Sequence, residues 1–203
     1  MTVVMRAQIE TEAVALLRSK MPVPLATGET FSAGEPRFPT PLACMIARAE
    51  AATVRSWARK YALKGWDKHP KRNAGILWSV LDLLKLRLQA VMVAAGIHPA
   101  DAAWRIGTDE TPDKIAQGNA AMFVALINDQ TLPSLMIFTE GGTAKHPTDR
   151  VSFHMVDPSK PIADVFAEVR AITLRDKLTL IDLRNIIADV ETGLAIEPVK
   201  VSA

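Results

Sequence analysis

Cysteine is almost absent from this chain of 203 residues, and Cys44 is the only one. A single thiol forms no intrachain disulfide and supplies no pair of thiolates for a metal ion. Aromatic residues make up only 5% of the sequence. Apolar runs stay well below the roughly 20 residues that a membrane-spanning helix needs. These shortages exclude a disulfide scaffold and a cysteine-based metal centre, and we expect no metal, no cofactor and no membrane partner.

Positive and negative charges also nearly balance, since the formal net charge is +2. The basic residues are nevertheless concentrated in one part of the chain, where only Glu50 and Asp67 oppose them. The cluster consists of Arg48, Arg55, Arg59, Lys60, Lys64, Lys68, Lys71 and Arg72. Such a cluster attracts a polyanion and gives salt-sensitive binding, although an ordinary solvated surface is the alternative.

Two short helical patterns lie at the start of this basic region. They cover Leu42 to Arg48 and Thr53 to Tyr61, and small residues from Ala49 to Ala52 separate them, which is the spacing of a helix-turn-helix. The second helix places apolar side chains on one face and polar or cationic side chains on the other. The apolar set is Val54, Trp57 and Ala58, and the opposite set is Arg55, Ser56, Arg59 and Lys60.

The segment that follows predicts a β-hairpin and then a long helix. Turn residues such as Gly65 and Pro70 alternate with lysines before the strand pattern of Ile76 to Trp78. Ser79 is predicted to cap the next helix, with Asp82 as the acid of a capping box. Gly96 is the predicted stop of that helix, and Pro99 is typical of the first turn of another.

Several of these elements, in this order, resemble the DNA-binding domain of MerR-type regulators. The resemblance covers residues 41 to 106, about a third of the chain. It depends on Thr53-Val54-Arg55-Ser56-Trp57, Ile76-Leu77-Trp78, Ser79-x-x-Asp82-Leu83 and Ala95-Gly96-Ile97-x-x-x-x-Ala102. The chain departs from the family pattern where Arg48 replaces the usual glycine of the turn, and where Asn73-Ala74-Gly75 replaces the usual arginine and tyrosine of the wing.

The resemblance implies a homodimer whose two recognition helices enter successive major grooves of a pseudo-palindromic double-stranded DNA site. The expected DNA-binding residues lie on the second helix and in the wing. They are Thr53, Arg55, Ser56, Arg59, Lys60, Lys64, Trp66, Lys68, Lys71 and Arg72. Tryptophans at positions 57, 78 and 104 are interpreted as core residues, whereas Trp66 lies between lysines and is a candidate for a backbone contact.

The rest of the chain divides into three further segments. Residues 1–20 are predicted as an amphipathic helix and residues 21–40 as an extended, proline-rich linker. The DNA-binding domain is assigned to 41–107, and the polar residues from Thr108 to Asp113 indicate a boundary. A second domain is assigned to 118–197.

This second domain shows short apolar runs that are typical of strands. Three strands in a meander are predicted at Ala120 to Ile127, Leu135 to Phe138 and Val151 to Met155. A helix from Pro161, a fourth strand over Leu178 to Leu183 and a last helix over Arg184 to Leu194 follow, with Gly193 marking the fraying end of that helix.

The last helix carries an apolar stripe that is predicted to form the dimer interface. The stripe consists of Ile186, Ile187, Val190 and Leu194, and packing on the domain's own sheet is the alternative. Asp189 on the same helix is interpreted as part of a solvated face. His146, His154 and Asp157 match no ligand spacing, so no catalytic residue is assigned.

The sequence thus predicts an α+β protein, with a mainly helical, MerR-like winged helix-turn-helix followed by a small α+β domain with an antiparallel sheet. The predicted function is a non-enzymatic, DNA-binding transcriptional regulator in the cytoplasm, associated with the nucleoid. One alternative is an architectural or excisionase-type DNA-binding protein of phage or mobile-element origin. Another is a protein-interaction module or small enzyme that uses the C-terminal domain.

Overall fold

The computed structural model describes residues 22–24, 30–32, 35–61, 77–107, 123, 126–127, 129, 131–140, 151–173 and 178–196. The predicted N-terminal helix over 1–20, the wing at 62–76 and the boundary segment at 108–113 lie outside these ranges. Within them the protein combines helices with small antiparallel sheets, so the predicted α+β class is confirmed.

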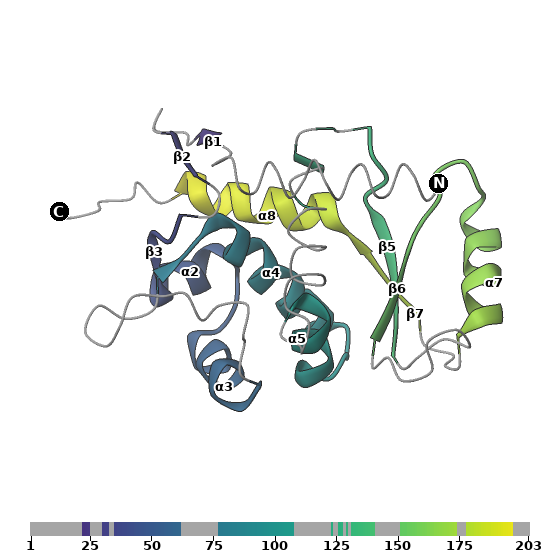
Figure 1. Cartoon of the computed structure of the whole chain (residues 1–203), viewed down its shortest axis with the longest axis horizontal. Coiled ribbons are helices and arrows are strands. Elements are labelled where there is room, and N and C mark those ends of the chain that lie inside the picture. The colour runs from purple at the N-terminus through teal and green to yellow at the C-terminus, as the bar shows by residue number, and fades with distance from the viewer. Residues whose placement is uncertain are drawn as a thin grey trace.

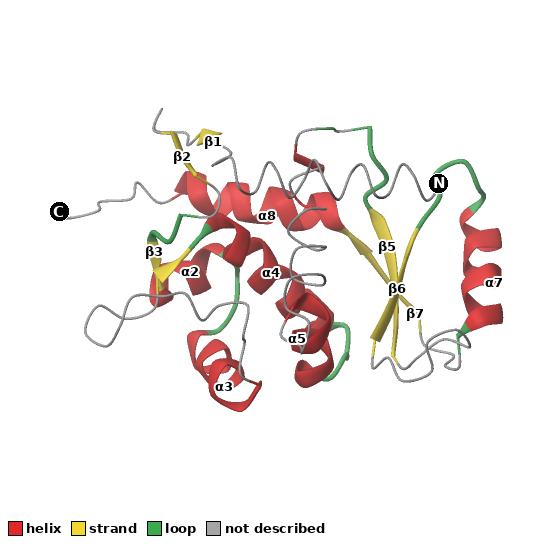
Figure 2. Cartoon of the chain, viewed as in Figure 1, coloured by secondary structure: helices red, strands yellow, loops and turns green. Residues whose placement is uncertain are grey.

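The helices of the N-terminal half gather at one end of the molecule, and a three-stranded sheet lies at the other (Figure 1). The helical end contains α2 (Thr40–Ile46), α3 (Ala51–Tyr61), α4 (Val80–Ala94) and α5 (Pro99–Gly107). The long helix α8 (Leu183–Ile196) leaves the sheet and crosses to α4 and α2 (Figure 2). The two ends are therefore connected by one continuous helix.

Helix α4 begins as the sequence predicts. The Ser79 hydroxyl oxygen accepts a hydrogen bond from the Asp82 backbone N–H at 3.2 Å, and the Asp82 carboxylate accepts one from the Ser79 backbone N–H at 2.9 Å. This reciprocal pair is a capping box, which satisfies N–H groups that have no partner in the first turn of a helix. Both side chains are buried, so the cap also satisfies polar groups inside the core.

The same helix ends at a glycine, also as predicted. Gly96 has a φ of 92°, a conformation that residues with a Cβ rarely adopt. The Ile97 N–H donates to the Met92 carbonyl at 3.0 Å and the Gly96 N–H donates to the Val93 carbonyl at 2.9 Å. These two bonds form a Schellman motif, and the side chain of Ile97 is buried beyond it. Helix α5 then starts at Pro99.

The sheet has the strand order β6-β5-β7, with β5 (Leu135–Glu140) in the centre. Both β6 (Val151–Met155) and β7 (Leu178–Asp182) pair antiparallel to it, so that Ile137 lies opposite His154 on one side and Leu180 on the other. The predicted strands at these positions are confirmed. The predicted meander is wrong. The third strand of the observed sheet is β7, which comes late in the sequence, and not residues 120–127.

The two faces of the sheet contribute to two different apolar clusters, since side chains alternate along a strand. Met136 and Phe138 belong to the main core, together with residues of the helical end and α8. Ile137 faces the other way and packs with Val165 and Val169 of α7 (Ile162–Ile172). Helix α7 therefore covers the outer face of the sheet (Figure 1).

Two predicted segments differ from the structure. Within the predicted strand Ala120 to Ile127, the described residues Phe123, Leu126 and Ile127 are helical. A short apolar run has no clear period, and alanines next to it favour a helix.

The segment 21–40 was predicted as an extended linker but contains short strands. These are β1 (Pro22–Pro24) and β2 (Thr30–Ser32), which pair antiparallel, and β3 (Phe38–Pro39).

The main core crosses the predicted boundary between residues 41–107 and 118–197. Leu183, Ile186 and Val190 of α8 belong to the same cluster as Ile46 of α2 and Leu84 of α4. These side chains are all nearly inaccessible to solvent. The helical end is thus completed by a helix from the C-terminal end of the chain, and the two predicted domains share one core.

Candidate nucleic-acid interface

Helix α3 presents two contrasting faces. Val54 and Trp57 are buried, with exposed fractions of 1% and 5%, and they anchor the helix in the main core. Arg55 is exposed, and Thr53 and Ser56 are partly exposed. The predicted assignment of faces is confirmed for these residues. The backbone of Arg59 and Lys60 continues α3, but their side chains lie outside the described part of the structure.

A hydrogen bond fixes the N-terminal turn of α3. The Thr53 hydroxyl donates to the Glu50 carboxylate at 2.9 Å, and the Val54 N–H donates to the Glu50 carbonyl at 2.9 Å. The carboxylate at this end of the helix is favoured by the helix dipole. The hydroxyl proton of Thr53 is therefore already donated to Glu50, and the hydroxyl oxygen can only accept a hydrogen bond from a further partner.

The turn between α2 and α3 occupies residues 47–50, two residues earlier than predicted. Arg48 adopts a φ of 49° in this turn, a left-handed conformation that glycine adopts at lower cost. The Arg48 N–H donates to the Met45 carbonyl, and the Ala49 N–H donates to the Cys44 carbonyl. Arg48 is the position at which the sequence departs from the usual glycine of the MerR-type pattern, and here an arginine adopts the left-handed conformation.

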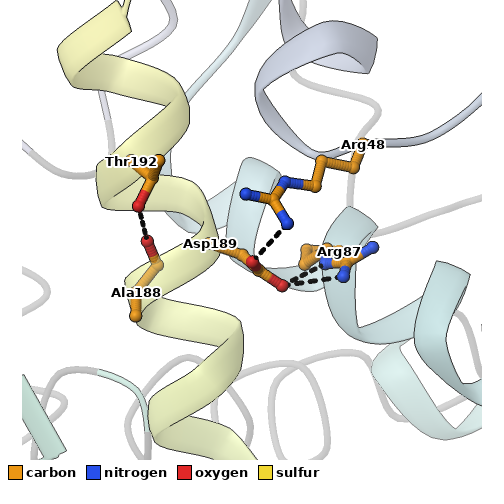
Figure 3. A network of polar contacts seen from close by, with 5 residues as sticks. All are labelled: Arg48, Arg87, Ala188, Asp189 and Thr192. Carbon is orange, nitrogen blue, oxygen red and sulfur yellow. Dashed lines mark hydrogen bonds and ion pairs between the residues drawn. The ribbon is translucent and has the colours of Figure 1, made fainter.

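The Arg48 side chain reaches across to helix α8. Its guanidinium lies 2.8 Å from one carboxylate oxygen of Asp189, whose other oxygen accepts hydrogen bonds from the Nε and a terminal nitrogen of Arg87 at 2.9 and 2.7 Å. Figure 3 shows the three side chains converging between α8, α4 and the turn. The prediction of a solvated Asp189 is wrong, because this carboxylate binds two arginines.

Cys44 lies on α2 and is buried. Burial raises the pKa of its thiol, and the nearby positive charge of Arg55 lowers that pKa by a smaller amount. The thiol is therefore neutral at physiological pH and packs as a small apolar group. This agrees with its interpretation as a core residue.

A pair of short strands joins the segment before α2 to the end of the predicted wing. β3 pairs antiparallel with β4 (Leu77–Trp78), so that Phe38 lies opposite Trp78, and both side chains are buried. The Trp78 indole N–H donates to the Thr40 hydroxyl at 3.0 Å, which joins β4 to the start of α2. The predicted wing residues Lys64, Trp66, Lys68, Lys71 and Arg72 belong to the connection from α3 to β4 and lie outside the described residues.

The predicted dimer face of α8 is occupied by the chain's own core. Ile186, Ile187 and Val190 are at most 9% exposed and pack in the main cluster, and Leu194 packs against it. The stripe correctly indicates burial, but its partners are α2 and α4 of the same chain. The intramolecular alternative therefore accounts for this face, with the helical end taking the place of the predicted sheet as the packing surface.

The contact between α8 and the α2–α3 turn was not predicted. Asp189 and Arg87 are 102 residues apart in the sequence, and no local pattern connects them. Gly193 was expected at a fraying helix end, but α8 continues to Ile196. A Cβ at position 193 would lie 2.8 Å from both the Cα and the carbonyl oxygen of Ile46, so the glycine allows α8 to lie directly on the backbone of α2.

No three side chains of the His, Cys, Asp and Glu types come together to form a metal site in the part of the chain that the structure describes. None of the described helices has the length and apolar character needed to cross a membrane. Comparison with protein-family models and with curated proteins finds no match for this chain.

Proposed function

We propose that this protein is a DNA-binding transcriptional regulator, in which α2, the turn and α3, with the β3–β4 pair, act as a winged helix-turn-helix. The observation that carries the proposal is the arrangement of α3. Its core face holds Val54 and Trp57, while Arg55 points to solvent, so a cationic side chain is available on a rigidly anchored helix. Such a helix can enter a major groove while its apolar face remains packed.

Two further features support this function. Basic residues are concentrated from Arg48 to Arg72, and half of these eight residues follow α3 directly in the sequence. The strands β3 and β4 bring the two ends of this region together, because β3 precedes α2 and β4 follows the predicted wing. Basic residues that follow a recognition helix closely in the sequence are suited to contacts with the phosphates that flank a groove.

The proposal includes a homodimer on a pseudo-palindromic site, since one short recognition helix reads few base pairs. The apolar stripe of α8 is not the proposed interface, because Ile186, Ile187 and Val190 are buried within one chain and Leu194 packs against the same core. Arg55 and Ser56 remain the proposed base-contacting or phosphate-contacting residues, together with Arg59, Lys60 and the wing lysines.

Substitution of Arg55 tests this function. We expect Arg55→Ala to lower the affinity for a duplex selected from a random pool by about 1–3 kcal/mol if Arg55 contacts a base. The measurement is fluorescence anisotropy of the labelled duplex at fixed salt, with far-ultraviolet circular dichroism as the check on folding.

Arg170→Ala is the matched control, because Arg170 is also exposed but lies on α7 over the outer face of the sheet. It removes the same charge and is expected to leave affinity almost unchanged. Equal losses in the two variants would mean that only net charge matters, and would remove α3 from the recognition role.

A further inference from the structure

Helix α8 is anchored to the sheet at its start. It follows β7 without an intervening residue, and the Arg184 N–H donates to the Asp182 carboxylate at 2.9 Å. The Leu183 N–H donates to the Ser134 carbonyl, next to the start of β5. The direction of α8 is therefore set by the sheet, at the end of the helix that is farther from α2.

The same helix touches the α2–α3 unit (residues 40–61) at two positions one turn apart. Asp189 binds Arg48 in the turn, and Gly193 lies against the backbone of Ile46 at the end of α2. Residues four apart lie on the same face of a helix, so one face of α8 contacts both the last turn of α2 and the turn that follows it. These contacts fix the backbone immediately before α3.

The ion pairs at Asp189 are partly shielded from water. The side chains of Asp189 and Arg87 are 22% and 19% exposed, whereas Arg48 is 54% exposed. Arg87 supplies two donors to one oxygen and so holds the carboxylate in place, while the other oxygen faces Arg48. The carboxylate thus joins α4 to a turn residue whose backbone is in the left-handed region.

We infer that Asp189 is a positioning residue for the recognition helix, holding the turn before α3 through Arg48. This inference rests on the proposed function, because positioning matters for binding only if α3 contacts DNA. The consequence is that the C-terminal sheet and α8 set the orientation in which α3 is presented. Asp189 and Gly193 are the two positions of α8 that contact the α2–α3 unit next to this turn.

The test compares full-length wild-type protein with Asp189→Asn, Asp189→Glu and Glu191→Gln. Glu191 is exposed on the same helix, so Glu191→Gln removes the same charge away from the turn. We expect Asp189→Asn to weaken binding to a selected duplex about tenfold, in line with the loss of a partly buried ion pair. Binding to a random duplex should not weaken, because Asp189→Asn removes a negative charge. Asp189→Glu should restore most of the specific affinity, and Glu191→Gln should behave as wild type.

Hydrogen exchange provides a readout that does not depend on DNA. Asp189→Asn should speed exchange in residues 47–57, with β5 and β7 unchanged, because the loss is local. Unchanged exchange in 47–57, or an equal increase throughout the chain, would overturn the inference. If wild-type protein binds no duplex but Asp189→Asn still loosens 47–57, the proposed function fails while the structural role of Asp189 stands.

Discussion

At the scale of single residues, Trp57 marks the buried face of α3, and Arg55 marks the exposed face. Trp57 is 5% exposed and belongs to the main core, whereas Arg55, two positions earlier, is exposed. A residue in this position contributes by filling space, since a cavity left in a packed core costs the lost contacts as well as the transfer free energy.

Trp57→Ala is therefore expected to lower the free energy of unfolding by about 3–5 kcal/mol, measured by urea denaturation. Met45→Ala serves as the control, because Met45 is 53% exposed on α2 and should change stability little. A Trp57→Ala protein as stable as the Met45→Ala protein would mean that the two faces of α3 have been assigned in reverse.

His154 is a partly buried histidine on the sheet, where burial disfavours its charged form. It lies on β6, on the sheet face that also holds Ile137, and its Nε2 is buried without a hydrogen-bond partner in the described part of the structure. Burial lowers the pKa of His154 below its ordinary value of 6.5. The unfolded chain therefore binds a proton at a higher pH than the folded chain does.

It follows that the contribution of His154 to stability is fully present above pH 6.5 and decreases as the pH falls from 6.5 toward the lowered folded-state pKa. We predict that His154→Leu removes this part of the decrease, as measured by thermal unfolding at a series of pH values. Identical acid slopes in wild type and variant would show that other groups are responsible. Between pH 7 and 8 neither protein should show a slope from this residue.

At the scale of elements, the contact between α8 and α2 depends on the absence of a side chain at Gly193. An alanine in an exposed helical position is more stable than glycine by up to about 1 kcal/mol. At position 193 the added methyl would instead meet the backbone of Ile46 at 2.8 Å, and a backbone cannot rotate away as a side chain can.

Gly193→Ala should therefore destabilise the protein by about 1–3 kcal/mol, the range of an overpacked core, in spite of the gain in helix propensity. Chemical denaturation measures the change. Ala188→Gly on the exposed side of α8 is the control, and it should lower stability by about 1 kcal/mol through propensity alone. A Gly193→Ala protein that is more stable than wild type would contradict the close packing of α8 on α2.

The elements that could be predicted from sequence are those whose signals lie within a few residues. Ser79 with Asp82, and Gly96 with Ile97, are local patterns that match the observed start and end of α4. Helical spacing likewise gave the buried positions of α3 and α8. The face of α8 was recognised as buried but given the wrong partner, because a stripe of apolar residues shows that a helix is covered and not what covers it.

The remaining errors have the same physical origin. The strand order depends on β7 pairing with β5 across about 40 residues, and the contact between Arg87 and Asp189 joins residues 102 apart. The run from Ala120 to Ile127 is apolar throughout, so that neither helical nor strand periodicity is present to decide between the two. Contacts of this kind are determined by packing of the whole chain.

At the scale of the whole molecule, the helical end and the sheet form one protein with a shared core. Leu183, Ile186 and Val190 of α8 complete the packing of α2 and α4. The predicted DNA-binding segment 41–107 therefore lacks part of its own core, and the complete chain is the appropriate form for binding studies.

The most direct test of the proposed function is the salt dependence of DNA binding by this complete chain. A duplex enriched from a random pool would be titrated by fluorescence anisotropy over a series of salt concentrations. We predict that the logarithm of the binding constant falls linearly with the logarithm of salt concentration, with a slope of about −0.9 for each phosphate contacted, and that the enriched sequences contain an inverted repeat. A protein that enriches no sequence and binds no duplex at low salt would contradict the proposal.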